Sequence, residues 1–142
     1  MLRLSGLLLL LVTALPLLAG EERFGDDIVY YSAFNSSFIS QDVARAYGVT
    51  RGKNRALVTV AVRRENAEGS VAVTAQVTGI NFDLIHKKPL DFREVREQDA
   101  IYYIAEFPFN DKELRSFTLT IQPAGVASSF DIKFNQTFYA DE

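Results

Sequence analysis

The 142-residue sequence contains no cysteine and no tryptophan, and it has one methionine and one histidine. Without cysteine the chain forms no disulfides, so its stability has to come from a buried apolar core. Copper and zinc sites draw on Cys, His and Met, which are reduced here to Met1 and His86. The composition therefore argues against a copper or zinc centre, and we expect neither a metal nor another cofactor.

The single histidine also limits catalysis. A serine or cysteine nucleophile needs a base held in place by a third group, and the sequence has no Gly-x-Ser-x-Gly elbow. His86 lies in a polar segment, 86–89, that is typical of a surface loop before a strand. The absence of tryptophan removes the indole surface that often stacks against sugars. These absences favour a protein that is not an enzyme.

The composition does not exclude catalysis by a pair of carboxylates, because the chain has many acidic residues. Asp91, Glu94 and Asp99 lie close together in the sequence, and a hydrolase would need two such carboxyl groups within about 10 Å in a cleft between loops. The alternative is that these side chains are solvated on the surface, where most acidic residues lie.

The first twenty residues have the order of charge and hydrophobicity of a secretory signal peptide. Arg3 precedes an unbroken apolar run over 7–12, Pro16 follows, and the small residues at 19–20 stand before a charged segment at 21–23. The apolar stretch is shorter than the roughly 18 to 20 residues that a membrane-spanning helix needs. We therefore predict a cleaved signal peptide over 1–20 and export from the cytoplasm, rather than an uncleaved membrane anchor.

The remainder, residues 21–142, has the length of a single domain. Removal of residues 1–20 takes away Arg3 and no acidic residue, which leaves 14 basic and 18 acidic side chains and a net charge of −4. Proteins that bind nucleic acid present a basic surface. The charge balance therefore argues against a nucleic-acid partner, and after cleavage no membrane-spanning segment is expected.

Alternation of apolar and polar residues dominates this domain, as in strands with one buried and one solvated face. The alternation is regular in three segments, whose predicted inward residues include Val71, Phe117, Leu119 and Ile121. Four other segments are rich in β-branched and aromatic residues. Turn-forming residues separate them. Seven short strands with frequent turns are typical of an antiparallel β-sandwich. The predicted strands are 27–34, 56–63, 71–78, 90–96, 101–107, 117–122 and 130–138.

One short helix is predicted between the first two of these strands. Ser40 can accept a hydrogen bond from the first turn, Asp42 suits the positive end of the helix, and Gly48 can end it. We expect three residues of this helix to pack down as a lid: Val43, Ala44 and Tyr47.

Several longer segments resemble a known family. They read FGD at 24–26, YSAFNSSF at 31–38, VARAYG at 43–48, PLDFREVRE at 89–97 and DAIYY at 99–103. In these segments the chain resembles an uncharacterised family of small exported bacterial proteins, domain of unknown function 4426. The resemblance implies a proteobacterial periplasmic protein with an immunoglobulin-like sandwich, and it brings no activity to transfer.

A basic turn is the sharpest candidate for a binding site. Arg51, Lys53 and Arg55 have the same parity in the chain, so an extended backbone projects them on one side, next to Asn54. They suit an anionic ligand or an acidic partner. The alternative is a solvated turn whose cations pair with the acidic residues of 93–97.

Adjacent tyrosines at 102 and 103 add to this candidate. Neighbouring residues of a strand point to opposite faces, so one of the two side chains can lie outside, where tyrosine is well suited to recognition. The candidate binding residues are Arg51, Lys53, Asn54, Arg55, Tyr102 and Tyr103.

We therefore expect a non-enzymatic periplasmic β-sandwich that acts through its surface. Its partner would be another envelope protein or a small anionic ligand. Two alternatives stay open: the hydrolase with paired carboxylates, and a structural component of the envelope without a discrete ligand.

Overall fold

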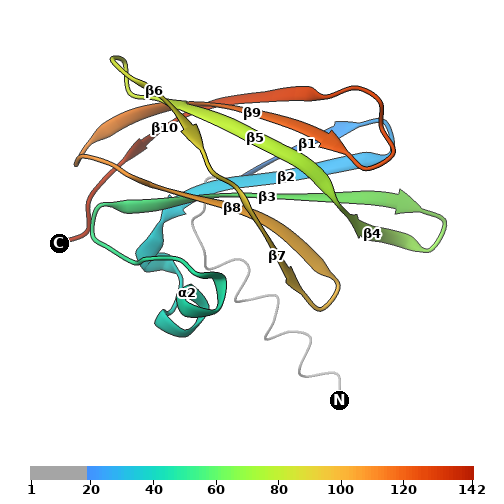
Figure 1. Ribbon diagram of the computed structural model, residues 1–142, viewed down its shortest axis with the longest axis horizontal. Coiled ribbons are helices and arrows are strands. Elements are labelled where there is room, and N and C mark those ends of the chain that lie inside the picture. The colour runs from blue at the N-terminus through green and yellow to red at the C-terminus, as the bar shows by residue number, and fades with distance from the viewer. Residues whose placement is uncertain (1–18) are drawn as a thin grey trace.

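Residues 19–142 form two antiparallel β-sheets packed face to face in the computed structural model, which describes this part of the chain (Figure 1). The first sheet has the order β1 (Ala19–Phe24), β2 (Asp27–Asn35), β3 (Arg55–Asn66), β8 (Ala100–Pro108) and β7 (Arg93–Glu97), with β4 (Gly69–Val73) paired to the end of β3. The second sheet has the order β10 (Phe130–Phe138), β9 (Glu113–Pro123), β5 (Ala75–Phe82) and β6 (Lys87–Leu90). The predicted β-sandwich class is confirmed.

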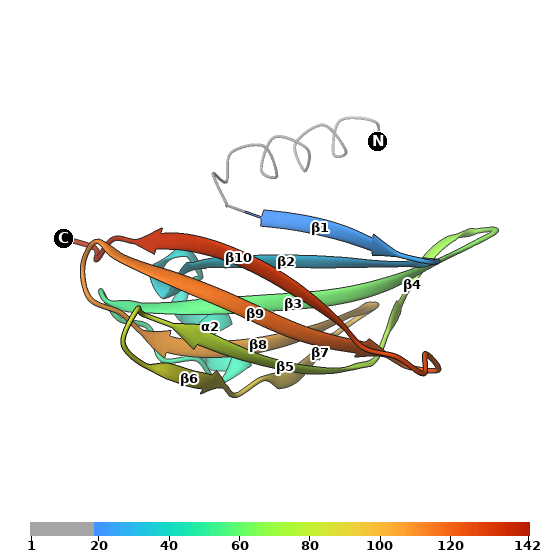
Figure 2. The ribbon, with the colours of Figure 1, turned by 90° about the horizontal axis from the view of Figure 1, so that it is seen from above.

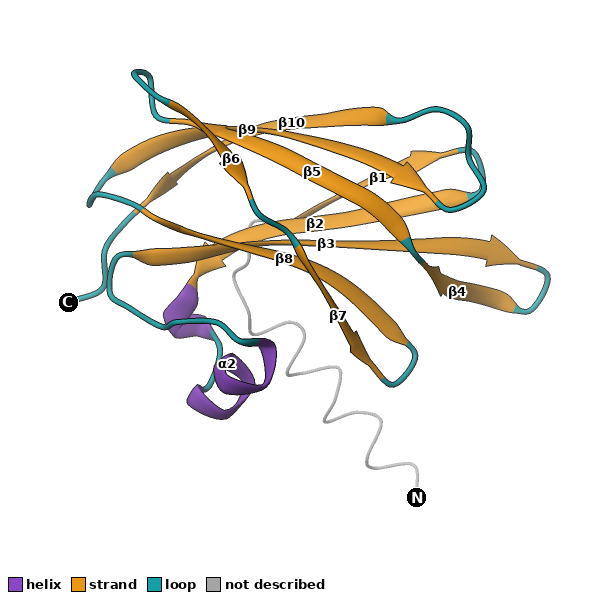
Figure 3. Cartoon of the chain, in the orientation of Figure 1, coloured by secondary structure: helices purple, strands orange, loops and turns teal. Residues whose placement is uncertain are grey.

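The connection from β2 to β3 contains the 3-10 turn η1 (Ser36–Phe38) and the helix α2 (Gln41–Tyr47) (Figure 3). No helix described for residues 19–142 combines the length and the hydropathy needed to cross a membrane. The predicted signal peptide lies outside the described residues, except for Ala19 and Gly20, which begin β1.

All seven predicted strands occur, but two of them are divided between the sheets. The segment 71–78 breaks at Thr74, so that β4 belongs to the first sheet and β5 to the second. At the break the Thr74 carbonyl accepts a hydrogen bond from the Ala124 amide (2.8 Å), and the Ala75 amide donates to the Tyr103 hydroxyl (2.9 Å). These bonds satisfy backbone groups where the chain changes sheets. The prediction of one continuous strand was wrong here.

The second division lies at 91–92, where the predicted strand 90–96 separates into β6 and β7. Leu90 is buried and Phe92 packs against the same core. Both approach Gly79 so closely that a Cβ atom there would lie about 3.1 Å from each side chain. Glycine at 79 therefore allows the chain to cross from one sheet to the other. With β1 added, the described residues contain ten strands instead of seven.

The core between the sheets is aromatic and aliphatic. The predicted inward residues of β9, Phe117, Leu119 and Ile121, are all buried. Val71 was also predicted to face the core, but it is 48% exposed because β4 belongs to the β3–β4 hairpin at the end of the sandwich opposite α2 (Figure 2).

A second, smaller core lies on the outer face of the first sheet. Ala44 of α2 and Val49 pack there against Leu57 and Ile104. The predicted helix is confirmed: the Ser40 hydroxyl accepts from the Val43 amide, and Gly48 ends the helix in the left-handed conformation (φ 70°, ψ 30°). Ala44 and Tyr47 pack down as expected. Val43 does not, because it lies on the exposed side of the helix.

The two faces of β9 give a matched test of this core. Leu119→Ala removes a fully buried side chain and should lower the free energy of unfolding by about 2–5 kcal/mol. Leu114→Ala makes the same change on the same strand at a residue that is 43% exposed, and it should cost less than about 1 kcal/mol. Urea denaturation measures both, and equal losses would contradict the assignment of the core face.

Candidate functional site

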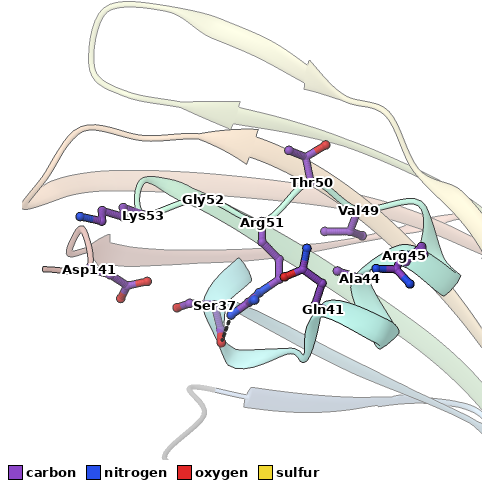
Figure 4. Close-up of a pocket in the computed structure, with 10 residues that line it drawn as sticks. All are labelled: Ser37, Gln41, Ala44, Arg45, Val49, Thr50, Arg51, Gly52, Lys53 and Asp141. Atoms are coloured by element: carbon purple, nitrogen blue, oxygen red, sulfur yellow. Dashed lines mark hydrogen bonds between the residues drawn. The ribbon is translucent and has the colours of Figure 1, made fainter.

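A pocket of about 630 Å³ lies where η1, α2, the loop 48–54 and the end of the chain meet (Figure 4). It adjoins the outer face of the first sheet, since Ala44 and Val49 belong both to its lining and to the smaller core. Three cationic side chains line it, Arg45, Arg51 and Lys53, with the single carboxylate of Asp141. Two members of the predicted basic turn, Arg51 and Lys53, are therefore together in this pocket.

The helix α2 supplies one wall. Gln41 and Arg45 are four residues apart, which places both on the same side of the helix, and both line the pocket. Arg45 comes within 3.8 Å of Asp42, one turn earlier, but both side chains are largely in solvent. An exposed pair of this kind is weak, so it leaves the Arg45 guanidinium available to a ligand.

The loop 48–54 supplies the opposite wall and is fastened to η1. The buried Ser36 hydroxyl accepts a hydrogen bond from the Gly52 amide (3.0 Å) and donates to the Gly52 carbonyl (3.1 Å). Val49 is buried beneath the start of the loop. These contacts fix the backbone on both sides of Arg51, so its side chain starts from a defined position.

Glu106 of β8 holds the same loop from the other side. Its carboxylate accepts from the Thr50 amide (2.8 Å) and pairs with both Arg55 (3.4 Å) and Arg93 (2.9 Å). Arg55 also donates to the Thr50 carbonyl (3.2 Å). Arg55 is therefore part of the scaffold and does not line the pocket, contrary to the expectation that it projects beside Arg51 and Lys53.

The alternative prediction for the turn, pairing with the acids of 93–97, also fails for Arg55. Glu94 instead pairs with Arg96 and accepts from the Tyr103 hydroxyl, and both interactions lower the pKa of Glu94. Glu97 accepts from the Tyr47 hydroxyl. The acid that pairs with Arg55 is Glu106, on the neighbouring strand β8.

Among the described residues, Arg51 and Lys53 have no acidic partner. The Arg51 guanidinium donates to the Ser37 carbonyl (3.3 Å), which directs it across the pocket (Figure 4). Within residues 19–142, no carboxylate lies within 4.0 Å of the charged nitrogens of Arg51 or Lys53. The pocket therefore carries uncompensated positive charge.

Asp141 closes the end of the pocket beside Lys53 (Figure 4). Its backbone amide donates to the Lys53 carbonyl (2.9 Å), and its Oδ1 accepts from the Asn35 amide group (3.3 Å). Among residues 19–142, its Oδ2 is buried and has no hydrogen-bond partner. These contacts tie the end of the chain to the Lys53 side of the pocket.

The remaining predicted residues lie elsewhere. The Asn54 carbonyl accepts from the Phe109 amide (2.9 Å), and Asn54 does not line the pocket. Tyr103 is only 5% exposed and its hydroxyl bridges Ala75 and Glu94. Tyr102 points to the opposite face, as predicted, but packs against the smaller core beneath α2. Neither tyrosine offers an exposed surface beside the basic turn.

Exposed aromatic side chains do lie beside the basic pocket, but they are Phe38 and Tyr139 instead of Tyr102 and Tyr103. A groove of about 370 Å³ shares Asp141 with the basic pocket and is lined by Phe34, Phe38 and Tyr139. Phe38 is 55% and Tyr139 61% exposed. Alternation indicates the exposure of Tyr139, because it directly follows Phe138, the buried last residue of β10. No sequence signal indicates Asp141, whose place depends on the chain folding back to Lys53.

The three carboxylates of the hydrolase alternative do not share a cavity. Of the five cavities described for residues 19–142, Asp99 lines one, and Asp91 and Glu94 line none of them. Within the same residues, no three His, Cys, Asp or Glu side chains are grouped so that they could hold a metal ion. The cationic pocket is therefore the candidate that the geometry supports best.

Comparison with known proteins agrees with this fold. The family model described as a domain of unknown function (DUF4426) matches residues 21–141. A solved structure of a DUF4426 family protein from Pseudomonas aeruginosa PAO1 is 37% identical, with a TM-score of 0.74 over 87% of this chain and 97% of that one. A comparison with curated protein sequences gave no match.

Two solved structures of FetP from uropathogenic Escherichia coli strain F11 share the fold at much lower identity. The protein as isolated, after expression in the periplasm, is 9% identical, with a TM-score of 0.61 over 87% of this chain and 95% of that one. A copper-bound variant is 9% identical, with a TM-score of 0.60 over 89% and 93%. At this identity the likeness concerns the fold alone.

Replacement of Glu106 tests whether this residue holds the loop. Glu106→Ala removes the acceptor of the Thr50 amide and the partner of two arginines, so we expect a loss of about 1–3 kcal/mol in the free energy of unfolding. Hydrogen exchange at Thr50 should also become faster. Glu68→Ala, at an exposed turn residue, is the control. Unchanged exchange at Thr50 would contradict the proposed role.

Tyr47, the last residue of α2, gives a test by pH. Burial, followed by the bond to Glu97, raises the pKa of Tyr47 to about 12. The folded protein therefore keeps a proton that the unfolded chain releases near pH 10. Stability should fall as the pH rises from 10 to 12. The advantage of the wild type over Tyr47→Phe in thermal unfolding should shrink over this range, whereas Tyr139→Phe, at an exposed tyrosine, should keep the wild-type profile.

Proposed function

This chain belongs to the DUF4426 family, and we propose that it is a non-enzymatic binding or accessory module that holds an anionic group in its cationic pocket. The group belongs either to another protein of the bacterial envelope or to a small anionic ligand. The observation that carries the proposal is the pair Arg51 and Lys53, which line one pocket without an acidic partner among the described residues.

Electrostatics supports this use of the pocket. Glu106 forms ion pairs with Arg55 and Arg93 outside the pocket. Arg45, Arg51 and Lys53 line the pocket itself. Positive charge concentrated in a concave surface raises the local concentration of anions and their rate of association. Arginine offers a planar pair of donors that suits carboxylate and phosphate groups.

The shape of the surface supports an extended ligand. Arg45 and Lys53 lie at opposite ends of the pocket, with Arg51 between them (Figure 4). The aromatic groove with Phe38 and Tyr139 continues from the end marked by Asp141. A partner that combines an acidic group with an apolar or aromatic one would contact both surfaces, as in interfaces where aromatic residues and arginine are enriched.

We propose that this module works in the periplasm. The charge and hydropathy pattern of residues 1–20 supports export, and FetP, which shares the fold, was expressed in the periplasm. Copper, which a FetP variant binds, does not fit the donors of this chain. His86 is its only histidine and lies exposed in a loop, cysteine is absent, and the single methionine is Met1. The residues of this chain therefore do not fit a copper site.

Charge reversal in the pocket tests the proposal. A photo-crosslinking residue at Gln41, which lines the pocket, should capture an envelope protein in living cells, or native mass spectrometry should detect a co-purified anionic ligand. Arg51→Glu or Lys53→Glu should reduce either signal by about tenfold, because attraction to the anion becomes repulsion. The signal should also weaken with rising salt concentration.

Lys133→Glu is the matched control. It makes the same change of charge at an exposed residue of β10, away from the pocket, and should leave the signal unchanged. The two readouts separate a protein partner from a small ligand. Equal signals from the wild type and the pocket variants would refute the proposal.

A further inference from the structure

The hairpin between β5 and β6 ends in the two most exposed large hydrophobic side chains of the described residues. Leu84 is 72% and Ile85 79% exposed. The hairpin tip, residues 83–86, projects at the end of the sandwich where α2 and the C-terminus also lie (Figure 2). Single exposed hydrophobic residues are common, but an adjacent pair at a projecting tip calls for a physical account.

The tip is held in one conformation. The Asp83 carboxylate accepts from the backbone amides of Ile85 (3.0 Å) and His86 (2.7 Å), and the Asp83 amide donates to the His86 carbonyl (3.2 Å). Leu84 has φ 82°, a left-handed conformation that suits glycine or asparagine and is unfavourable for leucine. The turn therefore carries a bulky apolar side chain at a position where the backbone alone favours a smaller residue.

The base of the hairpin is equally fixed. The buried Asn81 donates to the Lys88 carbonyl (3.1 Å) across the two strands and accepts from Arg115 of β9. Arg115 is itself buried and also binds Glu113 and the Pro108 carbonyl. Because this network anchors the hairpin to the next strand, Leu84 and Ile85 stand on a rigid support and do not fold back onto the core.

Cations lie directly beside the apolar tip. Lys87 and Lys88 follow it in β6, and both are exposed. Lys87 lies opposite Phe82, and the half-exposed Ile80 continues the apolar surface along β5. The one carboxylate of the tip, Asp83, is turned inward to its backbone bonds. The hairpin thus presents aliphatic side chains at its end and positive charge behind them.

We propose that the hairpin tip inserts into the surface of a bilayer that contains anionic phospholipids. Leu84 and Ile85 would enter the boundary of the acyl chains, where aliphatic side chains are stabilised. Lys87 and Lys88 would then reach the anionic head groups.

A protein partner fits this surface less well. Two side chains on a convex tip provide much less than the roughly 1,000 Å² that a specific protein interface buries. The tip also lacks the Trp, Tyr and Arg side chains that dominate such interfaces. The proposal rests on the hairpin tip and not on the cationic pocket, so either can fail without the other.

The absence of tryptophan makes a direct test available. Leu84→Trp introduces one fluorophore at the tip, and Val71→Trp introduces one at a half-exposed residue in the opposite hairpin. Both variants are expressed and purified in the same way as the wild type, so that all three proteins have the same N-terminus. With vesicles of phosphatidylglycerol and phosphatidylethanolamine, only the tryptophan at 84 should shift its emission to the blue and be quenched by brominated acyl chains.

Vesicle flotation with the tryptophan-free chain supplies the second readout. Ile85→Ser should reduce binding to the anionic vesicles by about tenfold, since one buried aliphatic side chain is lost. Lys87→Glu should reduce it severalfold, whereas Lys133→Glu should not. Vesicles of phosphatidylcholine alone should bind much more weakly.

Three results would overturn the proposal. One is an unchanged emission of the tryptophan at 84 with anionic vesicles. Another is an equal response of the tryptophan at 71. The third is undiminished flotation of Ile85→Ser. If vesicles are not bound and a crosslinker at Ile85 captures a protein instead, the tip is a protein-docking surface and the membrane proposal is wrong.

Discussion

Packing between aromatic rings joins the two sheets and supports everything else in this cysteine-free domain. Phe107 of the first sheet packs edge-on against Phe117 and Phe138 of the second, with ring centroids 5.5 Å and 5.1 Å apart. Phe134 of β10 stacks on Phe117, its partner across the β9–β10 pair, with ring centroids 4.8 Å apart. Such pairs add to the stabilisation from burial alone. Since no disulfide is available, this core has to hold the sheets face to face.

The core also explains why the site lies outside it. With the inner face of the first sheet covered by the second sheet, only its outer face is free, and α2 and Val49 cover part of that face over Leu57 and Ile104. The pocket forms at the edge of this cover. Glu106 neutralises only some of the nearby cations. It forms ion pairs with Arg55 and Arg93, whereas Arg51 and Lys53 do not pair with it. One carboxylate thus separates scaffold arginines from pocket cations.

The segments that line the pocket, α2 and the loop before β3 among them, lie at the same end of the sandwich as the hairpin between β5 and β6 (Figure 1). The pocket and the hairpin tip differ in character, since the pocket is concave and cationic, whereas the tip is convex and aliphatic with lysines behind it. If both proposals hold, insertion of the tip would bring the pocket close to the membrane surface. A module of this kind would meet its partner at the bilayer.

The sequence alone determined the local structure. Alternation in three segments and the β-branched and aromatic residues of four others located the predicted strands, and alternation also located the inward residues of β9. Ser40 and Gly48 marked the ends of the helix. These signals depend only on neighbouring residues. Tertiary structure decided the rest. Alternation continues through Thr74, so it cannot show that the chain changes sheets there. Arg55 left the predicted site because a distant strand supplies Glu106, and Asp141 entered it because the chain end returns to Lys53. Such contacts depend on which strands become neighbours, and no local pattern records that.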